Sequence, residues 1–352
     1  METNDQHTYQ ETTTTEYGQS EELCFDDILL LPRYSELDSR KSPSLSVILG
    51  GILKLDLPLV SAAMDSITGK RMLVAMDRQG GVGILSRYIN LDHNKEISRQ
   101  KNEIRWAIDK GAKNIGCAIG IRNDPFNTAN ELLDTGCNVI CIDVAHADHR
   151  KVYETLTILE KLRGRYSFVL MAGNICTSTA AHKMIEHGVN TIKVGIGPGA
   201  VCTTRAVTGF GRPQLSAIQD CVSATCGYNV SIIADGGLRT TGDCIKSLWA
   251  GASACMMGYM LAGTDCAPDI DGHKIYRGMS SRSASGRSDI ASEGVEFPVK
   301  YKGSTNEKLI EYAKGMKSGL AMAGAMDIEG LRQCDFVRVS PLCTVESRPK
   351  QG

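Results

Sequence analysis

The sequence predicts a closed (β/α)8 barrel, and three observations lead to this fold class. Eight short aliphatic runs recur along the 352 residues, and stretches with helical periodicity lie between them. Most runs are apolar at every position, which is typical of parallel strands buried on both faces. The chain also holds 36 glycines and only 5% aromatic residues. This composition suits an aliphatic core with many tight strand-to-helix turns.

The eight strands are expected in regular succession along the chain. They lie at residues 58–62, 81–85, 114–118, 139–143, 168–172, 191–194, 231–234 and 254–257. Eight successive strand-then-helix units close into a barrel. An open doubly wound sheet is the alternative, but no G-x-G-x-x-G pattern follows the first strand.

Four of the intervening helices have clear sequence signals. They are expected at residues 151–163, 177–187, 213–224 and 241–250. In the first of them, apolar residues at a spacing of three or four form one stripe, from Val152 to Leu162. Gly188 and Gly251 are placed to end two of the helices.

The segments before and after the predicted strands differ from them in composition. Residues 1–22 are polar and Thr-rich, which predicts a disordered tail, and the barrel is expected to span residues 23–345. Beyond the eighth strand, the Ser- and Gly-rich segment at about 280–294 predicts a mobile flap. Residues 304–333 then supply a further helix.

Charge and cysteine content exclude several classes of protein. With 39 basic and 40 acidic residues, the chain has no excess of positive charge for a nucleic acid or a membrane surface. No apolar run reaches the length of a membrane span, and the polar start predicts no signal peptide. The 13 cysteines are scattered and include no C-x-x-C pair. We therefore expect free thiols in a cytoplasmic protein.

The strongest functional signal is the Gly-rich loop at 195–211, which follows the sixth strand and carries Cys202. Chemistry in barrels sits at the carboxyl ends of the strands. Glycines let backbone groups converge on a ligand, and Arg205 beside the cysteine favours a thiolate nucleophile. The alternative is a glycine-rich turn with an inert cysteine.

Two further strand ends carry groups suited to a nucleotide. Asp235, followed by Gly236 and Gly237, ends the seventh strand, and Gly258 follows the eighth. The carboxylate can accept from ribose hydroxyls, and the glycine amides can approach a phosphate. The alternative is a pair of tight turns.

Other polar residues have less specific patterns. The segment from Asp143 to His149 ends the fourth strand, and hydrogen-bonding groups at a ligand mouth are favoured there over a metal site. Lys193 is expected to pair with a neighbouring carboxylate. Glu293 is a candidate proton-transfer group if the flap folds over the site, and a surface charge otherwise.

Together these segments resemble the inosine monophosphate dehydrogenase and guanosine monophosphate reductase family. The resemblance runs in family order through residues 25–32, 58–65, 80–83, 193–205, 234–237, 276–279 and 292–294. It implies a (β/α)8 barrel, usually in a homotetramer, that binds a purine nucleotide monophosphate and forms a covalent thioimidate at Cys202. The regulatory domain that many family dehydrogenases carry after the second strand is expected to be missing, because the chain passes from Tyr88 to Ile115 without it.

The flap favours one of the two family reactions. The resemblance implies that dehydrogenases need an Arg-Tyr pair on a long flap, and the stretch from Ser283 to Ser292 is short and has none. We therefore predict a reductase that uses NADPH to convert guanosine monophosphate to inosine monophosphate and ammonia. One alternative is an NAD-dependent inosine monophosphate dehydrogenase without the regulatory domain. The other is a purine nucleotide sensor without catalytic activity.

The resemblance also implies roles for individual residues. The catalytic set is Cys202, Thr204 and Glu293, in which the last two relay a proton. The nucleotide is expected on Met64, Asp235, Gly236, Gly237, Gly258, Tyr259, Tyr276, Gly278, Met279, Ser280, Ser292 and Gly294. The cofactor is expected on Arg87, Asp143, Val144, Ala145, Lys193 and Gly195. A monovalent cation, K⁺, is expected on backbone carbonyls of Gly197, Gly199 and Cys202.

Several positions depart from the reductase pattern. The segments around residues 60–65 and 80–84 look more like those of the dehydrogenases. Arg87 stands where reductases usually have Lys, and Ile290 where they commonly have Arg. Ala200 replaces a phosphate-contacting Ser, and Tyr259 stands where a small residue is usual.

Overall fold

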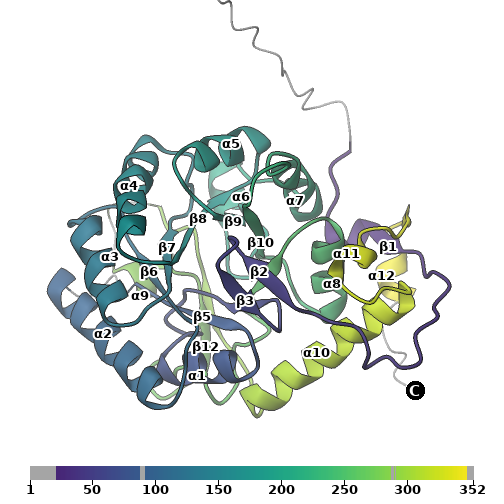
Figure 1. Cartoon of the computed structure of the whole chain (residues 1–352), viewed down its shortest axis with the longest axis horizontal. Helices are drawn as coiled ribbons and strands as arrows, with labels where there is room; N and C mark the ends of the chain where they lie inside the picture. The colour runs from purple at the N-terminus through teal and green to yellow at the C-terminus, as the bar shows by residue number, and fades with distance from the viewer. Residues whose placement is uncertain (1–20, 88–91, 287–288, 290, 347–352) are drawn as a thin grey trace, which may run out of the picture.

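Eight parallel strands close into a barrel in the computed structural model, which describes residues 21–87, 92–286, 289 and 291–346 (Figure 1). The hydrogen-bonded order is β10-β11-β4-β5-β6-β7-β8-β9. The strands are β4 (Leu59–Ser61), β5 (Val82–Leu85), β6 (Ile115–Ile119), β7 (Val139–Asp143), β8 (Val169–Ile175), β9 (Thr191–Val194), β10 (Ser231–Asp235) and β11 (Ala254–Met257). The predicted fold class and all eight predicted strands are confirmed; the largest difference is that β8 continues three residues further than predicted.

A ring of helices covers the outside of the barrel (Figure 1). Its members are α1 (Lys70–Arg78), α2 (His93–Asp109), α3 (Pro125–Asp134), α4 (Arg150–Glu160), α5 (Ser178–Glu186), α7 (Gln214–Ser223), α8 (Thr241–Trp249) and α10 (Thr305–Met322). Thr177 and Thr240 cap α5 and α8 by accepting hydrogen bonds from first-turn amides. Gly188 and Gly251 follow these helices with φ of 81° and 106°, so their predicted role as helix ends is confirmed. The predicted helix at 151–163 is divided, because a 3₁₀ turn replaces its last residues.

Two apolar layers explain why the strands are apolar at every position. Val139 and Cys141 of β7 point into the barrel interior, whereas Ile140 and Ile142 of the same strand pack beneath the helices. The other strands alternate in the same way. Both faces of each strand are therefore covered, which favours aliphatic residues at successive positions.

A short hairpin closes the amino end of the barrel. It consists of β2 (Val47–Leu49) and β3 (Leu53–Leu55) and lies across the barrel mouth in Figure 1. Leu49 and Leu55 are fully buried in the interior cluster. At the hairpin turn, the Gly50 amide donates to Oγ of Ser231, the first residue of β10, at 3.0 Å.

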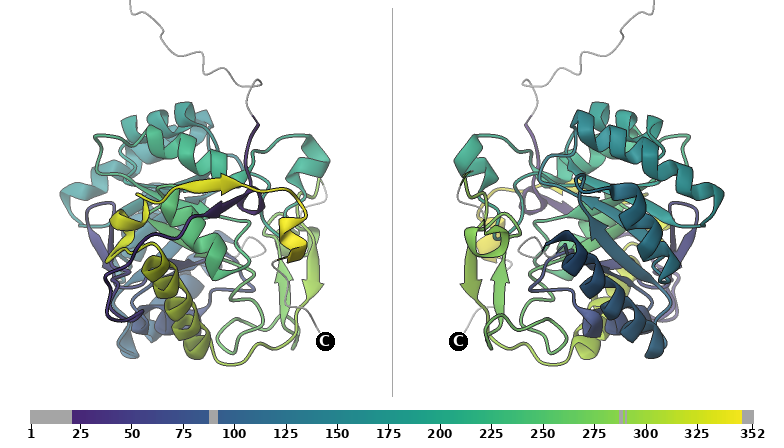
Figure 2. Two further views of the ribbon diagram at one scale, coloured as in Figure 1. Left: turned by 90° about the vertical axis from the view of Figure 1, so that its right-hand side faces the viewer. Right: turned by 90° about the vertical axis from the view of Figure 1, so that its left-hand side faces the viewer.

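Short elements outside the barrel were missed by the sequence analysis. Strand β1 (Ile28–Leu30) pairs with β14 (Phe336–Arg338), joining the two ends of the described chain. In the flap, β12 (Ile275–Arg277) pairs with β13 (Glu296–Pro298), and α9 (Arg282–Ser285) lies between them. Figure 2 shows this flap on the opposite side of the barrel from the β2–β3 hairpin. The remaining short helices are η1 (Phe25–Asp27), α11 (Ile328–Leu331) and α12 (Cys343–Glu346).

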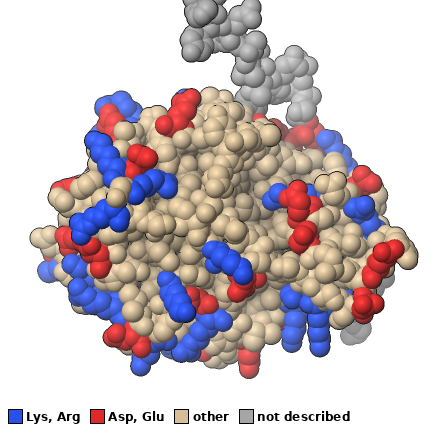
Figure 3. All heavy atoms as spheres, viewed as in Figure 1, with Lys and Arg blue, Asp and Glu red and all other residues tan. Residues whose placement is uncertain are grey.

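The surface agrees with the balanced charge of the sequence. Lys and Arg are interspersed with Asp and Glu over the face shown in Figure 3. Within the described ranges, no helix has both the length and the apolar character needed to cross a bilayer. Residues 1–20 of the predicted tail (1–22) and Ile290 lie outside the described residues. Glu21 and Glu22, the last two residues of that tail, are described and form ion pairs with Arg338 and Arg212.

Candidate active site

A cavity of about 1050 Å³ opens at the carboxyl ends of the strands, where the sequence analysis placed the chemistry. It is lined by most of the predicted site residues, including all three of the catalytic set and all of the cofactor set. The predicted residues that do not line it are Ser292 and Gly294. The Ser292 hydroxyl instead donates to the carbonyls of Ser280 and Gly294, so it shapes the flap from behind the cavity wall.

The cysteine loop leaves β9 through a glycine that no other residue can replace without a shift. Gly195 has a φ of 147°, and a Cβ there would lie 1.9 Å from the carbonyl oxygen of Asp235. The close approach brings the ends of β9 and β10 together. A helix that was not predicted, α6 (Thr204–Thr208), then begins inside the loop, two residues after Cys202. Its short turn directs the Thr204 side chain back toward the cysteine.

The three residues of the catalytic set form a hydrogen-bonded chain. The Cys202 thiol lies 3.2 Å from Oγ1 of Thr204, and that hydroxyl donates to Oε2 of Glu293 at 2.7 Å. The chain links the loop after β9 to the flap, which is separated by 89 residues of sequence. A proton on the thiol therefore has a continuous route to a carboxylate.

Backbone hydrogen bonds hold the flap against the cysteine loop. The Thr203 amide donates to the carbonyl of Glu293 at 2.9 Å, and the Val295 amide donates to that of Val201 at 3.0 Å. Cys202 and Gly294 form an antiparallel bridge. The flap thus pairs with the loop as a short antiparallel strand. This backbone pairing positions Glu293 next to Thr204.

Cys202 differs from most other cysteines of the chain in its surroundings. All 13 cysteines are free thiols, and seven of them are buried. Burial raises the pKa of Cys137 and of Cys141 to about 12, so these thiols stay protonated and inert. Cys202 is partly exposed at the cavity wall, where a substrate can reach it.

A buried cation joins two carboxylates on the cavity floor. Lys193 of β9, 2% exposed, donates to Asp143 of β7 and, at 3.2 Å, to Oδ2 of Asp235 of β10. Burial acts to lower the pKa of the Lys193 ammonium group, but the two carboxylates outweigh it and hold that pKa above its usual range. The predicted pairing of Lys193 with a carboxylate is confirmed.

Two amide side chains that the sequence analysis missed complete this floor. Nδ2 of Asn174 donates to Oδ2 of Asp235 at 3.0 Å and to the carbonyl of Gly195 at 2.7 Å. Nε2 of Gln214 donates to the carbonyls of Val194, at 2.8 Å, and Asp235, at 3.2 Å. An isolated Asn in a strand (Asn174 in β8) or Gln at the start of a helix (Gln214 in α7) carries no sequence signal of such a role.

Backbone approach and aromatic packing shape the end of the cavity where the nucleotide was predicted. Gly236 and Gly237 have φ of 100° and 77°, a conformation that favours glycine. A Cβ on Gly258 would lie 2.5 Å from the hydroxyl of Tyr276, so this strand end also requires glycine. Tyr259, Tyr276 and Phe297 pack together with ring centroids 5.7–6.3 Å apart. Ala200 lines the same cavity and offers no hydroxyl.

An ion pair at the end of β12 supports the residues that follow this strand. Arg277 donates to both carboxylate oxygens of Asp65, at 3.0 and 2.5 Å, and both side chains are nearly buried. Next to this pair, the Asp65 amide lies 3.5 Å from Sδ of Met279. The pair therefore fixes the segment that carries Gly278, Met279 and Ser280 toward the cavity.

The side of the cavity where the cofactor was predicted has further lining residues beyond the predicted set. Nη2 of Arg87 donates to the carbonyl of Asp143 at 3.1 Å. Gln100 is buried in α2, and its Nε2 donates to the carbonyl of Ser86, just after β5, and to that of Ala118 in β6. Further lining residues that sequence reasoning missed are His93, Glu96, Ile121, Arg122, Asn123 and Thr128.

Possible metal ligands after β7 have other partners. Asp148 accepts from Tyr153 at 2.5 Å and from Lys183 at 3.4 Å, and His149 caps α4 by accepting from the Lys151 amide. The part of the chain that the structure describes contains no cluster of three His, Cys, Asp or Glu suited to a metal ion. In the cysteine loop, the Gly199 carbonyl accepts a hydrogen bond from the Cys202 amide at 3.0 Å.

The fold and the cavity are those of a barrel enzyme. A partly exposed thiol, a hydroxyl that links it to a carboxylate, and two carboxylates paired with a lysine face one pocket at the carboxyl ends of the strands. The model of one family, described as "IMP dehydrogenase / GMP reductase domain", matches residues 22–350. The chain belongs to this family.

Relatives of this chain include three named "Inosine-5'-monophosphate dehydrogenase". The one from Cryptosporidium parvum is 34% identical over 374 residues, which cover 90% of this chain and 92% of the relative. That from Borreliella burgdorferi is 32% identical over 394 residues, covering 94% and 96%. That from Nitrosopumilus maritimus is 29% identical over 468 residues, covering 94% and 98%. All three alignments are longer than the 352 residues of this chain, so each of these relatives holds residues with no counterpart here.

These relatives overturn the prediction of a guanosine monophosphate reductase. The curated relatives reported above are dehydrogenases, and they match over nearly the whole chain. The prediction was wrong because it relied on the missing Arg-Tyr pair of the flap. A missing feature of one short segment discriminates less than agreement along the barrel, and the dehydrogenase-like segments near residues 60–65 and 80–84 pointed the other way.

Proposed function

We propose that this protein is a dehydrogenase that oxidises inosine monophosphate to xanthosine monophosphate with NAD and water. The observation that carries the proposal is the Cys202–Thr204–Glu293 chain at the wall of a cavity large enough for a nucleotide and a cofactor. The names of the relatives support the direction of the reaction. NAD takes the place of the predicted NADPH, because NADPH was inferred only from the reductase assignment.

In the first half of the reaction, Cys202 forms a bond to C2 of the purine. The thiol proton moves to Glu293 through Thr204, so the sulfur attacks as a thiolate. The bound nicotinamide supplies the acceptor for the hydride that leaves C2. The product of this half is a thioimidate that joins Cys202 to the nucleotide.

In the second half, water attacks C2 and the bond to sulfur breaks. The water must lose a proton, and the described flap residues contain no Arg-Tyr pair to accept it. Thr204 lies between the cysteine and Glu293, so it accepts the proton while its own passes to the carboxylate. Glu293 must release the first proton before this step. The sulfur leaves C2 as a thiolate, and xanthosine monophosphate is released. The thiolate then takes the proton from Glu293 through Thr204, which restores both the thiol and the carboxylate.

The rest of the cavity orients the two ligands. We infer that Asp235 accepts from the ribose hydroxyls of the nucleotide and that amides at Gly236, Gly237 and Gly258 hold its phosphate. Met279 and Ser280 face the base. On the other side, Arg87, Asp143, Val144 and Ala145 suit the cofactor, with Lys193 holding Asp143 in place. Carbonyls of Gly197, Gly199 and Cys202 are proposed to hold a monovalent cation such as K⁺ that rigidifies the loop.

We further propose a homotetramer in the cytoplasm. Exposed apolar side chains on the β1–β14 pair, including Leu29, Phe336 and Val337, are suited to contacts between copies. The 13 free thiols suit a reducing compartment. Light scattering of the purified chain tests the assembly, and a monomer at micromolar concentration would contradict it.

Two assays of nicotinamide absorbance test the proposed activity. With inosine monophosphate and NAD, we expect reduced nicotinamide to appear. With guanosine monophosphate and NADPH, we expect no oxidation. Turnover in the second assay alone would contradict the proposal, and nucleotide binding without turnover in either assay would favour the sensor alternative.

A further inference from the structure

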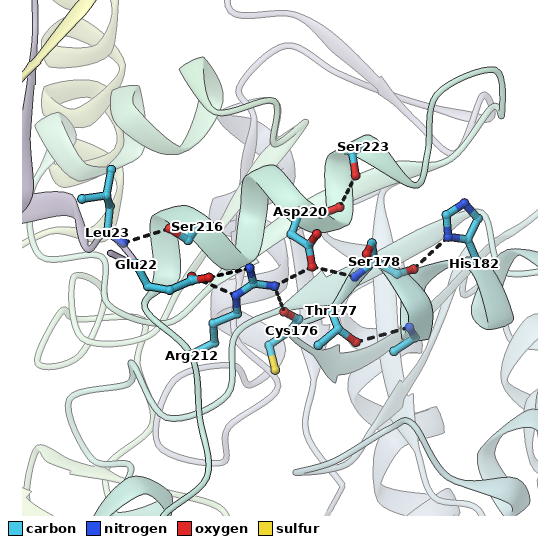
Figure 4. A network of polar contacts seen from close by, with 11 residues as sticks. Glu22, Leu23, Cys176, Thr177, Ser178, His182, Arg212, Ser216, Asp220 and Ser223 are labelled. Atoms are coloured by element: carbon cyan, nitrogen blue, oxygen red, sulfur yellow. Dashed lines mark hydrogen bonds and ion pairs between the residues drawn. The ribbon is translucent and has the colours of Figure 1, made fainter. Parts of the chain in front are cut away.

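An arginine at the end of the cysteine loop joins four separate segments of the chain (Figure 4). Arg212 is 13% exposed in its side chain, and its guanidinium makes a forked ion pair with Glu22, at 2.9 and 2.8 Å. Nη1 of the same group donates to Asp220 of α7, at 2.5 Å, and to the Cys176 carbonyl after β8, at 3.0 Å. A charged side chain is seldom this little exposed unless it is paired, and here the partners come from three other segments of the chain.

The two carboxylates are themselves held in place. Oδ2 of Asp220 also accepts from the Ser178 amide at the start of α5, at 2.9 Å. Next to Glu22, the Leu23 amide donates to Oγ of Ser216, and the Ser216 amide donates to the carbonyl of Leu23 (Figure 4). These two hydrogen bonds hold the segment just before the barrel on the first turn of α7, next to the residue that pairs with Arg212.

The backbone of Arg212 closes the cysteine loop. Its amide donates to the Ile196 carbonyl at 3.3 Å, and its carbonyl accepts from Nη2 of Arg205 at 2.5 Å. The Arg205 side chain packs against Gly197 and Gly211, where a Cβ would lie within 2.7 Å of it. Arg205 directly follows Thr204 in α6, so a shift of Arg212 passes through Arg205 to the proton relay.

We propose that Arg212 is a positioning residue for Cys202, and that Glu22 and Asp220 hold it in place. The chain segment that precedes the barrel therefore supports the catalytic loop. Arg212 with two carboxylates is a nearly buried charged cluster, and removal of one partner leaves its charge poorly compensated. The loop is then expected to move, and small displacements of reacting groups cost large factors in rate.

The test compares Glu22→Gln with Glu21→Gln. The second is a matched control, because Glu21 is the neighbouring residue and its ion pair with Arg338 is exposed on both sides. Arg212→Lys is a third variant that keeps the charge but loses the fork. Two quantities are measured on the full chain: the alkylation rate of Cys202 by iodoacetamide across pH, followed by peptide mass, and kcat and KM for inosine monophosphate.

For Glu22→Gln and Arg212→Lys, we expect kcat to fall about tenfold with little change in KM, and the pH profile of Cys202 alkylation to shift. Glu21→Gln should match the unmodified protein within about twofold, since exposed pairs contribute little. The kinetic part rests on the proposed function, whereas the alkylation part does not. If Glu22→Gln and Glu21→Gln give the same alkylation profile, the positioning role is wrong, even in a protein with no turnover.

Discussion

The two ends of the barrel are built from the same eight strands but differ in structure and in proposed role. At the amino end, the β2–β3 hairpin covers the mouth with apolar side chains, and Leu49 and Leu55 are fully buried. At the carboxyl end, glycine turns, ion pairs and amide side chains surround an open cavity. The contrast teaches that stability and chemistry are separated along each strand. Strand β9 is an example. Thr191, at its amino end, is buried in the barrel, whereas Lys193, near its carboxyl end, pairs with the carboxylates that line the cavity.

Removal of the nucleophile should produce the largest effect. We expect Cys202→Ala to lower turnover of inosine monophosphate by at least about 10³-fold, because the variant lacks the sulfur that forms the proposed covalent bond. Nucleotide binding, measured by calorimetry, should persist. Cys226→Ala is the control, since Cys226 is exposed and is not among the residues that line the cavity. Appreciable activity in the Cys202 variant would rule out the covalent route.

The proton relay should come next. Glu293→Gln keeps the shape of the side chain but cannot accept a proton, so kcat should fall by about 10²-fold. Glu296→Gln in β13 serves as the matched change, because Glu296 is exposed and absent from the cavity wall. The measurement is steady-state turnover across pH. Equal rates for the two variants would mean that another group activates the water.

A substitution at the amino end of the barrel should lower stability and leave turnover almost unchanged. Leu55→Ala leaves a void in the interior cluster, and we expect the free energy of unfolding to fall by about 2–5 kcal/mol. The kcat of the folded enzyme should hardly change. Ile52→Ala, on the exposed turn of the same hairpin, should cost less than about 0.5 kcal/mol. Denaturant unfolding gives both values, and a large loss of kcat in Leu55→Ala would break the separation of the two ends.

Asp220 makes a limited contribution to stability at the catalytic end. Burial acts to raise the pKa of its carboxyl group, but the Ser178 amide and Arg212 outweigh it and lower that pKa. Its stabilisation is therefore present above the unfolded pKa, about 3.9, and is lost as pH falls through the lower folded pKa. We expect Asp220→Asn to lower the free energy of unfolding at neutral pH by about 1–3 kcal/mol.

This difference between Asp220→Asn and the unmodified protein should shrink in acid. Denaturant unfolding at neutral pH and below pH ~4 measures it. Asp134→Asn is the comparison, because the pair of Asp134 with Arg165 is largely exposed. A difference that stays constant with pH would show that the ionised form of Asp220 is not the stabilising one.

The smallest effect concerns the phosphate subsite. Ala200 lines the cavity without a hydroxyl, and Ala200→Ser adds one where the family resemblance implies a phosphate-contacting Ser. A single added hydrogen bond of about 1 kcal/mol should lower the KM for inosine monophosphate about fivefold. An unchanged KM, with kcat also unchanged, would place the phosphate elsewhere.

Sequence reasoning succeeded where a pattern has one physical cause. Strands buried on both faces must be apolar throughout, so all eight could be predicted, and strand ends then located Cys202, Asp235 and Gly258. It failed for β1 and β14, three-residue strands whose partners lie about 300 residues apart in the chain. Such pairing depends on tertiary contacts rather than on local periodicity.

The roles of single polar residues were equally hidden. Glu22, Arg212 and Asp220 each look like surface charges in the sequence, and only the closed barrel brings them together. Asn174 and Gln214 lack a motif for the same reason. The choice between reductase and dehydrogenase was missed because it was drawn from one flap segment, whereas the whole chain carries the family signal.

The central claim is that oxidation of inosine monophosphate passes through a covalent bond to Cys202. The most direct measurement mixes the protein with inosine monophosphate and NAD, quenches it in acid within the first turnover, and determines the mass of the Cys202 peptide. We predict a nucleotide adduct on this peptide that forms together with reduced nicotinamide and is missing from Cys202→Ala. Reduced nicotinamide formed at the same rate without an adduct, or by the alanine variant, would contradict the account.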